Sequence, residues 1–521
     1  MIAAARGGTL GGRWGVLTTC CALVFVIALN TTAINSAVNA MADDLGLTSS
    51  ELAWAINVYL LAVATIVATA GQLGDLVGIK RVVMIGLAIF VAGSVVTATA
   101  DSAVQLIAGR AGQGFGAAFL MPASMSAISL AFPPERRATA LGIWGAVAGI
   151  GFAIGPLFGG IWTDAVSWRG IFWSDVPILV ATAVLALATL GGLGKPERRK
   201  PLDFQGAIAL AVALFLLVLG LQQGGGWGWT SPTLIAVLVG SALAFAVFAF
   251  IEQRRQFPLM HLKLLGNRIY AGGNLATFSG TAALIGLLYF FNLFTQSVVT
   301  FGFSAVTSSL VLLPYGLSMF VFALLAGRVA DKMGYVLPVA GGLLASGIGF
   351  ALFAIVAPEL SEAALWIPLV LTGLGVGATF ATAGAGGMSV VPRDEAGEAA
   401  GTINVSRYIG GAVGLAIGAS LYVGVAVDTF NRKLVESGIP EGERESLDTA
   451  LTGSPAGLQS TLDDLGNPPR DLMEGSAQQA TIDGFVAAMW FLAVLCLVSA
   501  VVVAYTMRRP RGPGRKPLRT A

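Results

Sequence analysis

Charged side chains are scarce in this sequence. Asp, Glu, Lys and Arg make up 11% of its 521 residues, whereas an ordinary soluble domain carries roughly 25%. Hydrophobic residues make up 56% of the chain, and the mean hydropathy is +0.81. This composition argues against an ordinary soluble domain and predicts a chain that lies mostly within a lipid bilayer.

Groups that bind metals or act as nucleophile and base are also few. The single histidine, His261, lies in a basic polar stretch, and the three cysteines, Cys20, Cys21 and Cys496, lie in apolar runs. Adjacent cysteines cannot form an ordinary structural disulfide, and no spacing matches a metal site. The sequence also lacks a nucleotide-binding loop and a catalytic dyad. We therefore predict no enzyme activity, no catalytic residue, no metal site and no cofactor.

Long uncharged stretches are abundant. A helix needs about 20 apolar residues to cross the hydrocarbon core. Two stretches, 204–251 and 269–327, have a turn-rich centre, so each predicts a pair of helices. Single helices are predicted over 14–42, 52–74, 82–100, 104–134 (which holds one arginine), 138–163, 176–194, 333–358, 363–392, 408–427 and 484–507. We therefore expect an all-α polytopic membrane protein with fourteen transmembrane helices.

Basic residues mark alternate connections between these helices. Most Lys and Arg residues fall in every second connection and near the two ends of the chain. Connections rich in Lys and Arg stay on the cytoplasmic side. We therefore predict a multi-pass protein of the cell (plasma) membrane with both termini in the cytoplasm. The acidic segment 428–483 is then an extracytoplasmic loop, which we expect to be flexible or partly ordered.

The chain divides into two six-helix halves around an inserted pair of helices. An internal repeat supports this division, because the pattern G-x-x-x-D-x-x-G occurs at 71–78 and again at 327–334. Related halves with a substrate site between them are common in secondary transporters. The expected parts are a cytoplasmic N-terminus (1–13), an N-terminal bundle (14–194), a basic linker with two inserted helices (195–268), a C-terminal bundle (269–507) and a basic cytoplasmic tail (508–521).

The repeated motif predicts a charge latch at the cytoplasmic ends of the helices. Its acids are Asp75 and, in the second half, Asp331, and the bases Lys80 and Arg81 follow the first copy. Glycines let helix ends approach closely, so these charges can pair and hold one state of two rocking bundles closed. A short polar turn is the simpler alternative.

Three other features predict parts that carry charge or move. Arg110 stands alone in an uncharged helix, where a charge costs a few kcal/mol and marks a functional site by default; the alternative is a side chain that reaches back to the outer surface. Gly155 and Pro156 end a glycine-rich helical stretch. Glycine gives a smooth packing face and proline a kink, which suits a sliding contact between bundles. Arg407, near the inner end of a later helix, is either an interfacial anchor or a functional group.

Together, these motifs resemble the major facilitator superfamily, and within it the fourteen-helix drug:proton antiporters. The resemblance implies the major facilitator fold, with two six-helix bundles plus two inserted helices. It also implies export of hydrophobic or amphiphilic compounds by proton antiport and alternating access. The matching residues are Gly71, Leu73, Asp75, Gly78, Lys80 and Arg81 in the first loop, Leu106, Arg110, Gln113, Gly114 and Gly116 in helix 4, Gly155, Pro156, Gly159 and Gly160 in helix 5, and Trp168, Arg169, Ile171 and Phe172 before helix 6.

One position departs from that family in a way that concerns proton coupling. Helix 1 of the family usually carries an aspartate, the implied proton carrier beside the helix 4 arginine, whereas this chain has Asn30 there. An amide cannot titrate. Asp175, where the family usually has asparagine, is the nearest candidate, and we expect it to serve as a relocated proton site or to pair with Arg110. An interfacial acid without a coupling role is the alternative.

The expected substrate cavity combines polar and aromatic groups from several helices. Aromatic rings attract organic cations, so we expect a small hydrophobic or cationic organic substrate, exchanged for protons with the proton gradient as the energy source. Because the helix 1 acid is missing, a second hypothesis stays open: a lipid or specialised-metabolite exporter with weak or absent proton coupling. The expected partners are the lipid bilayer and protons, and no nucleic acid. The candidate cavity residues are Asn30, Asn35, Trp54, Tyr59, Gln113, Trp144 and Phe290.

Overall fold

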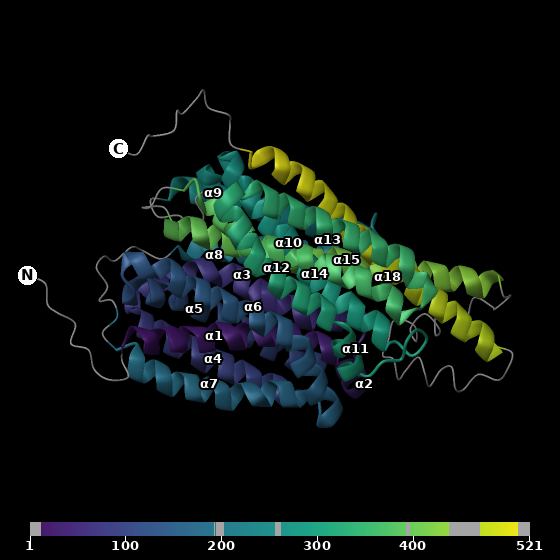
Figure 1. The fold of residues 1–521 in the computed structure, drawn as a ribbon. Helices are drawn as coiled ribbons and strands as arrows, with labels where there is room; N and C mark the ends of the chain where they lie inside the picture. Colours follow the sequence, from purple (N-terminus) through teal and green to yellow (C-terminus); the bar gives the residue numbers. More distant parts are fainter. Residues whose placement is uncertain are drawn as a thin grey trace, which may run out of the picture.

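The computed structural model describes residues 12–191, 193, 203–255, 262–391, 396–436 and 469–508. Long helices that run roughly parallel to one another dominate these residues (Figure 1). Fourteen helices of this part of the chain are long and apolar enough to cross a membrane, which confirms the predicted all-α, fourteen-helix architecture. A helix satisfies its own backbone hydrogen bonds, so it can cross lipid where no water is available.

The N-terminal bundle contains six spans. The first span continues through a short 3₁₀ segment, so it is longer than the predicted 14–42. In chain order the elements are α1 (Arg13–Ala33), η1 (Ile34–Ala37) and α2 (Val38–Leu45), which form the first span, then α3 (Ser49–Val77), α4 (Ile79–Ala98), α5 (Ala103–Ala131), α6 (Pro134–Ala165) and α7 (Arg169–Thr189).

The inserted pair and the C-terminal bundle follow. The inserted pair is α8 (Phe204–Trp227) and α9 (Pro232–Arg254). The C-terminal elements are η2 (Leu262–Gly266), α10 (Arg268–Gln296), α11 (Ala305–Val311), α12 (Leu313–Met333), α13 (Val336–Val356), η3 (Ala357–Glu359), α14 (Glu362–Met388), α15 (Ala396–Glu436) and α18 (Pro469–Thr506).

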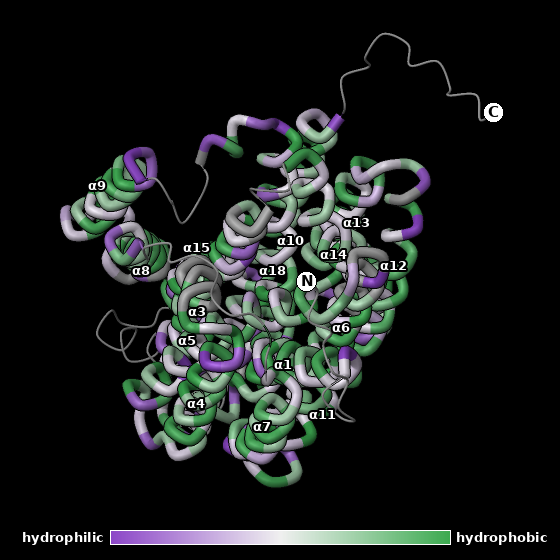
Figure 2. Tube along the Cα trace, turned by 90° about the vertical axis from the view of Figure 1, so that its left-hand side faces the viewer, coloured by the Kyte–Doolittle hydropathy of each residue, from purple (hydrophilic) through white to green (hydrophobic). Residues whose placement is uncertain are grey.

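The view along the helices places α8 and α9 at the edge of the molecule, beside α3 and α15 (Figure 2). Both α8 and α9 present large apolar side chains outward, including Phe215, Val239 and Leu243. Such a surface matches a lipid surrounding. We call the end of the molecule where α1 begins and α18 ends the terminal end, at the left of Figure 1, and the other the distal end.

Two helices extend into the segment predicted to be a flexible or partly ordered loop. α15 continues to Glu436, and α18 begins at Pro469, so both ends of the segment 428–483 are helical. These extensions bury a small apolar cluster between them that includes Phe430, Leu434 and Met473. Burying these side chains against each other stabilises helix beyond the hydrophobic spans. Residues 437–468 lie outside the described part.

The internal repeat ends each copy on the same kind of turn. Gly78, between α3 and α4, has a φ of 92°, and Gly334, between α12 and α13, has a φ of 82°. A side chain strains this backbone conformation, which glycine adopts readily. The residues before each glycine belong to a helix rather than to a loop, so most of the motif lies at a helix end.

Candidate functional site: a buried polar cluster and a cavity between the bundles

Arg110 lies in a buried polar cluster of the N-terminal bundle. The side chain is 1% exposed, so it does not reach back to the surface. Its Nη1 donates to Asn30 Oδ1 at 2.5 Å and to Gln113 Oε1 at 2.7 Å, and its Nε donates to the Ala55 carbonyl at 3.3 Å. Its Cζ lies 4.5 Å from the centroid of the Tyr59 ring. Hydrogen bonds and the ring face replace the water that a buried guanidinium loses.

Asp175 lies on the other side of the two amides. Its Oδ2 accepts from Asn30 Nδ2 at 2.7 Å, from Ser94 Oγ at 3.1 Å and from Gln113 Nε2 at 3.3 Å. Each amide therefore turns its oxygen to Arg110 and its nitrogen to Asp175. The two charged groups are bridged, and no direct ion pair between them is found among the described residues.

The burial of Asp175 corrects the picture of an acid at the membrane interface. The sequence predicted a helix over 176–194, but α7 begins seven residues earlier, at Arg169. Asp175 is consequently in the second turn of the helix, and its side chain is 1% exposed. Ser94, which completes its surroundings, is a member of the polar cluster that the sequence reasoning missed. A lone serine in an apolar helix gives no signal of its partner.

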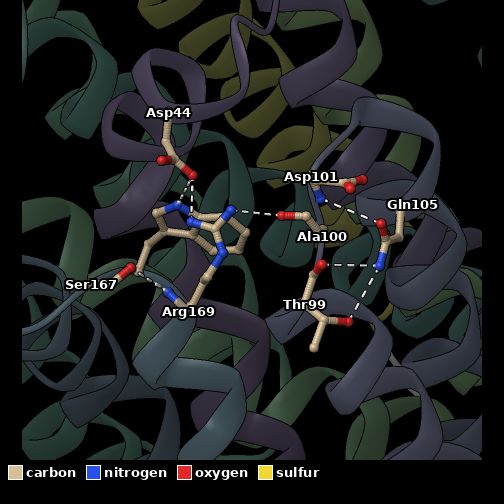
Figure 3. Close-up of polar contacts among 8 residues, drawn as sticks. Asp44, Thr99, Ala100, Asp101, Gln105, Ser167 and Arg169 are labelled. Atoms are coloured by element: carbon tan, nitrogen blue, oxygen red, sulfur yellow. Dashed lines mark hydrogen bonds and ion pairs between the residues drawn. The ribbon is translucent and has the colours of Figure 1, made fainter.

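Trp168 and Arg169 hold the distal end of the N-terminal bundle together (Figure 3). Arg169 forms an ion pair with Asp44 of α2, and its Nη2 donates to the Ala100 carbonyl at 2.7 Å. Trp168 Nε1 donates to the same carboxylate at 3.1 Å. These contacts join α2, the α4–α5 connection and the start of α7. They lie within one bundle, so this pair of residues fixes the start of α7 and does not join the two bundles.

The glycine-rich face of α6 packs tightly against the helices of both bundles. A Cβ on Gly155 would lie 1.8 Å from Thr32 Oγ1, and one on Gly159 would lie 2.1 Å from the Ala33 carbonyl oxygen. A Cβ on Gly160 would lie 2.7 Å from the Ala305 carbonyl oxygen of α11. Only a residue without a side chain fits at these distances. The G-P-x-x-G-G motif thus allows α6 to contact α1 and α11 directly.

The backbone around Pro156 accepts hydrogen bonds from both bundles. Proline has no N–H for the Phe152 carbonyl, and Thr32 Oγ1 donates to this carbonyl at 3.2 Å. The Pro156 carbonyl accepts from Ser36 Oγ at 2.7 Å and from Ser309 Oγ at 2.8 Å. Since Ser309 belongs to the C-terminal bundle, this carbonyl ties the two bundles together.

Two further contacts complete this distal seal. Gln296 Nε2 of α10 donates to the Ser36 carbonyl at 3.2 Å. Asp164, at the end of α6, accepts from the backbone N–H of Val306 at the start of α11 at 2.9 Å. We use the term distal seal for Ser36, Pro156, Asp164, Gln296, Val306 and Ser309. It closes the space between the bundles at the distal end.

A cavity of about 370 Å³ lies between the bundles on the terminal side of the distal seal. A volume of this size suits a small organic molecule. Its wall is mainly apolar and combines side chains from both bundles, among them Met121 of α5, Trp144 and Phe152 of α6, Phe380 of α14, and Arg407 and Tyr408 of α15. Each bundle supplies part of the wall, so a rocking motion of the bundles would change the shape of the cavity.

Of the seven residues expected to line a cavity, Trp144 does so. Asn30, Gln113 and Tyr59 belong to the polar cluster. Asn35 donates to the Thr31 and Thr32 carbonyls, Trp54 packs against Phe215 of α8, and Phe290 packs against Tyr289 and Tyr422. Arg407 was expected near the inner end of its helix and lies in the cavity wall.

The charge latch falls mostly outside the described side chains. The side chains of Asp75 and Asp331 are among those not described, so their pairing stays a prediction. Lys80 donates from Nζ to the Leu187 carbonyl of α7 at 3.1 Å, and Arg81 is exposed. Lys80 thus contacts a neighbouring helix of the same bundle.

The sequence matches a family model and several export proteins. A family model described as Major Facilitator Superfamily matches residues 20–415. The chain is 30% identical over 509 residues to the tetracenomycin C resistance and export protein of Streptomyces glaucescens, which covers 96% of this chain and 93% of that one. It is 33% identical over 431 residues to the cephamycin export protein CmcT of Amycolatopsis lactamdurans. This match covers 79% of this chain and 87% of that one.

The fold also resembles solved structures. A bacterial homolog of the human lysosomal transporter Spinster, in an inward-facing and unoccupied conformation, matches with a TM-score of 0.63 and 16% identity. The match covers 97% of this chain and 100% of that one. At this identity the likeness concerns the fold alone.

Proposed function

This chain belongs to the major facilitator superfamily, and on that premise we propose that it exports hydrophobic or amphiphilic organic compounds across the cell membrane, driven by proton entry. The observation that carries the proposal is the cavity between two bundles that a hydrogen-bonded seal closes at one end. Alternating access requires such a site, open in turn to either side. The export functions in the names of the relatives support the same conclusion.

The orientation follows from the basic residues. The connections rich in Lys and Arg, with both chain termini, belong on the cytoplasmic side. The distal seal then closes the extracytoplasmic side, and the cavity lies toward the cytoplasm. This arrangement corresponds to the state that would take up a compound from inside the cell.

A transport assay in an efflux-deficient host tests the proposal. Cells that express the protein should accumulate less of at least one compound from a panel of neutral, cationic and anionic amphiphiles than cells with an empty vector. A protonophore should remove this difference, because it dissipates the gradient. Equal accumulation across the whole panel would contradict export, while export that persists with the protonophore would favour the uncoupled lipid or metabolite exporter.

We assign the coupling proton to Asp175. A carboxyl group buried beside a bridged guanidinium changes the local charge balance when it takes up a proton. Protonation removes the negative partner of Arg110 and turns Asp175 into a possible donor to the amides of Asn30 and Gln113. Loss of the negative charge weakens the hydrogen bonds through Oδ2 that join α1, α4, α5 and α7, which gives the proton a way to act on helix packing.

Proton release in proteoliposomes tests this assignment. We expect Asp175→Asn to abolish proton movement driven by substrate, whereas Asp101→Asn, which alters an exposed distal acid, should leave it intact. The sharper variant is the exchange Asn30→Asp with Asp175→Asn. Because the two side chains touch at 2.7 Å, the exchange moves the carboxyl by one hydrogen bond and should restore coupling. Equal proton signals in wild type and Asp175→Asn would refute the assignment.

A further inference from the structure

Arg407 is a partly buried cation without a hydrogen bond or an ion pair among the described residues. The Nε atom of its guanidinium is buried and makes no hydrogen bond there, and no ion pair of Arg407 is found in the same part of the chain. Its Cζ lies 4.6 Å from the centroid of the Phe380 ring. A guanidinium in a mainly apolar wall is costly unless hydrogen bonds or an opposite charge compensate it. The site is therefore electrostatically incomplete.

Arg110 provides an internal comparison. It donates to two side-chain amides and one backbone carbonyl, all supplied by the protein. Both arginines lie in the membrane-spanning region, Arg110 fully buried and Arg407 partly buried, but in the described part of the fold only Arg110 has hydrogen-bond partners for its guanidinium. The difference between them is that Arg407 faces the cavity. A group that enters the cavity can supply what the fold does not.

We propose that Arg407 binds the negatively charged group of the exported compound, so that the cavity selects amphiphilic organic anions with an aromatic or apolar body. This inference rests on the proposed export function and names its substrate class. A carboxylate suits the site because its two oxygens can accept two parallel hydrogen bonds from a guanidinium. The ring of Phe380 supports the guanidinium plane.

The rest of the wall suits the body of such a molecule. Phe152 of one bundle and Phe380 of the other pack edge to face, with centroids 5.4 Å apart, and Trp144 lies in the same wall. The hydroxyl of Tyr408, next to Arg407, faces Met121 Sδ. A thioether is a weak acceptor, so an anionic oxygen can accept the hydrogen bond of this hydroxyl instead. Apolar and aromatic surface therefore surrounds one cationic end.

The charge of the wall disfavours organic cations. The described residues that line the cavity contain one guanidinium and no carboxylate. A cation placed beside Arg407 would be repelled in a medium of low dielectric constant, where charges act strongly. The cationic substrate expected from the aromatic residues alone is thus less compatible with this cavity than an anion.

Equilibrium binding to the purified protein in zwitterionic nanodiscs tests the inference. Three probes share one ring system: 9-anthracenecarboxylate, its methyl ester and 9-anthracenylmethylammonium. Energy transfer from tryptophan to anthracene reports binding, since Trp144 lines the cavity. We expect the carboxylate to bind about tenfold more tightly than the ester, and the ammonium compound to bind more weakly than both.

Substitutions separate the role of Arg407 from general effects. Arg407→Gln should remove the preference for the carboxylate while leaving ester binding unchanged, which also shows that the variant is folded. Arg407→Lys should keep part of the preference. Arg268→Gln, which removes an exposed charge at the start of α10, should behave like wild type. The inference is overturned if wild type binds acid and ester equally, or if Arg407→Gln keeps the preference.

This experiment fails separately from the proposed function. Binding selectivity is measured without transport, so a carboxylate preference in a protein that exports nothing would leave the anion site at Arg407 standing and end the export proposal. Export of neutral amphiphiles by a protein without carboxylate preference would support the export proposal and overturn the inference of an anion site.

Discussion

At the scale of single residues, two amides determine how Arg110 and Asp175 interact. Asn30 and Gln113 each contact both charged groups, so the charges are linked through neutral side chains. Either charge alone would be buried without an opposite charge nearby. Removal of one partner of a buried charge pair is strongly destabilising, whereas replacement of both by apolar groups can be nearly neutral.

The pair of variants Arg110→Leu and Arg110→Leu with Asp175→Leu tests this interdependence. We expect the single variant to lower the free energy of unfolding by about 3–5 kcal/mol, because it leaves the Asp175 carboxylate uncompensated. The double variant should recover a large part of that loss. Unfolding of the purified protein by SDS, followed by intrinsic fluorescence, measures both; equal losses in the two variants would contradict an energetic link.

Sequence reasoning at this scale located Arg110 and misjudged the depth of Asp175. A single charge in an uncharged run is visible in the sequence, so Arg110 was identified as a candidate. For Asp175 an interfacial position stayed open as the alternative, because the helix was predicted to begin after this residue. In the structure the helix begins at Arg169, whose partners Asp44 and Ala100 lie at the distal end. Deeper in, three polar side chains donate hydrogen bonds to the acid.

At the scale of elements, α6 has the tightest fit in the distal seal. Gly155, Gly159 and Gly160 each lie where a Cβ would come within 3 Å of a neighbouring atom, whereas a Cβ on Gly341 of α13 would meet nothing within 4 Å. The neighbours of Gly159 and Gly160 are backbone carbonyl groups that cannot rotate away. Closure of the seal therefore depends on the absence of side chains along α6.

Gly159→Ala should weaken the distal seal. The added methyl group overlaps the Ala33 carbonyl of α1, so α1 and α6 must separate, and Ser36, which follows Ala33, is displaced from its partners Pro156 and Gln296. Ser309→Cys, 1% exposed in the closed seal, reports opening through reaction with a membrane-impermeant maleimide after Cys20, Cys21 and Cys496 are replaced by alanine. We expect faster labelling in Gly159→Ala than in Gly341→Ala; equal rates would show that the seal tolerates the methyl group.

The spans were predictable and the cavity was not, for physical reasons. Lipid requires long apolar helices, so the number of spans follows from hydropathy. Apolar and aromatic residues, however, serve equally for lipid contact, helix packing and cavity walls. Trp54, Tyr59 and Phe290 all contact other helices or the polar cluster, and only the tertiary arrangement distinguishes them from Trp144.

At the scale of the whole molecule, the two bundles are joined at the distal end and separated by the cavity nearer the terminal end. The contacts of the distal seal are neutral hydrogen bonds, except for the carboxylate of Asp164, which accepts from the N–H of Val306. One hydrogen bond to a charged group contributes about 1.5–3 kcal/mol. A seal of this kind can be broken and re-formed during a transport cycle.

Asp164→Ala should shift the protein toward distal opening. Loss of the contact with Val306 weakens closure, and a change of about 1.4 kcal/mol shifts an equilibrium tenfold. Spin labels at Asp101→Cys and Glu359→Cys, in the two bundles, should show a larger population of long distances by double electron–electron resonance. Asp483→Ala removes a hydrogen bond to Thr429 within one bundle and should leave the distances unchanged; an unchanged distribution in Asp164→Ala would exclude this role.

Arg110 and Asp175 do not line the cavity, while Met121, on the same helix as Arg110, does. A bound compound and a proton at Asp175 would consequently not compete for one side chain, and each would sense the other through the position of α5. Because the two sites do not overlap, nothing steric prevents the protein from changing state with a proton bound and no compound in the cavity. It should show a measurable proton leak when no compound is present, and the size of that leak would report how rigidly α5 transmits strain.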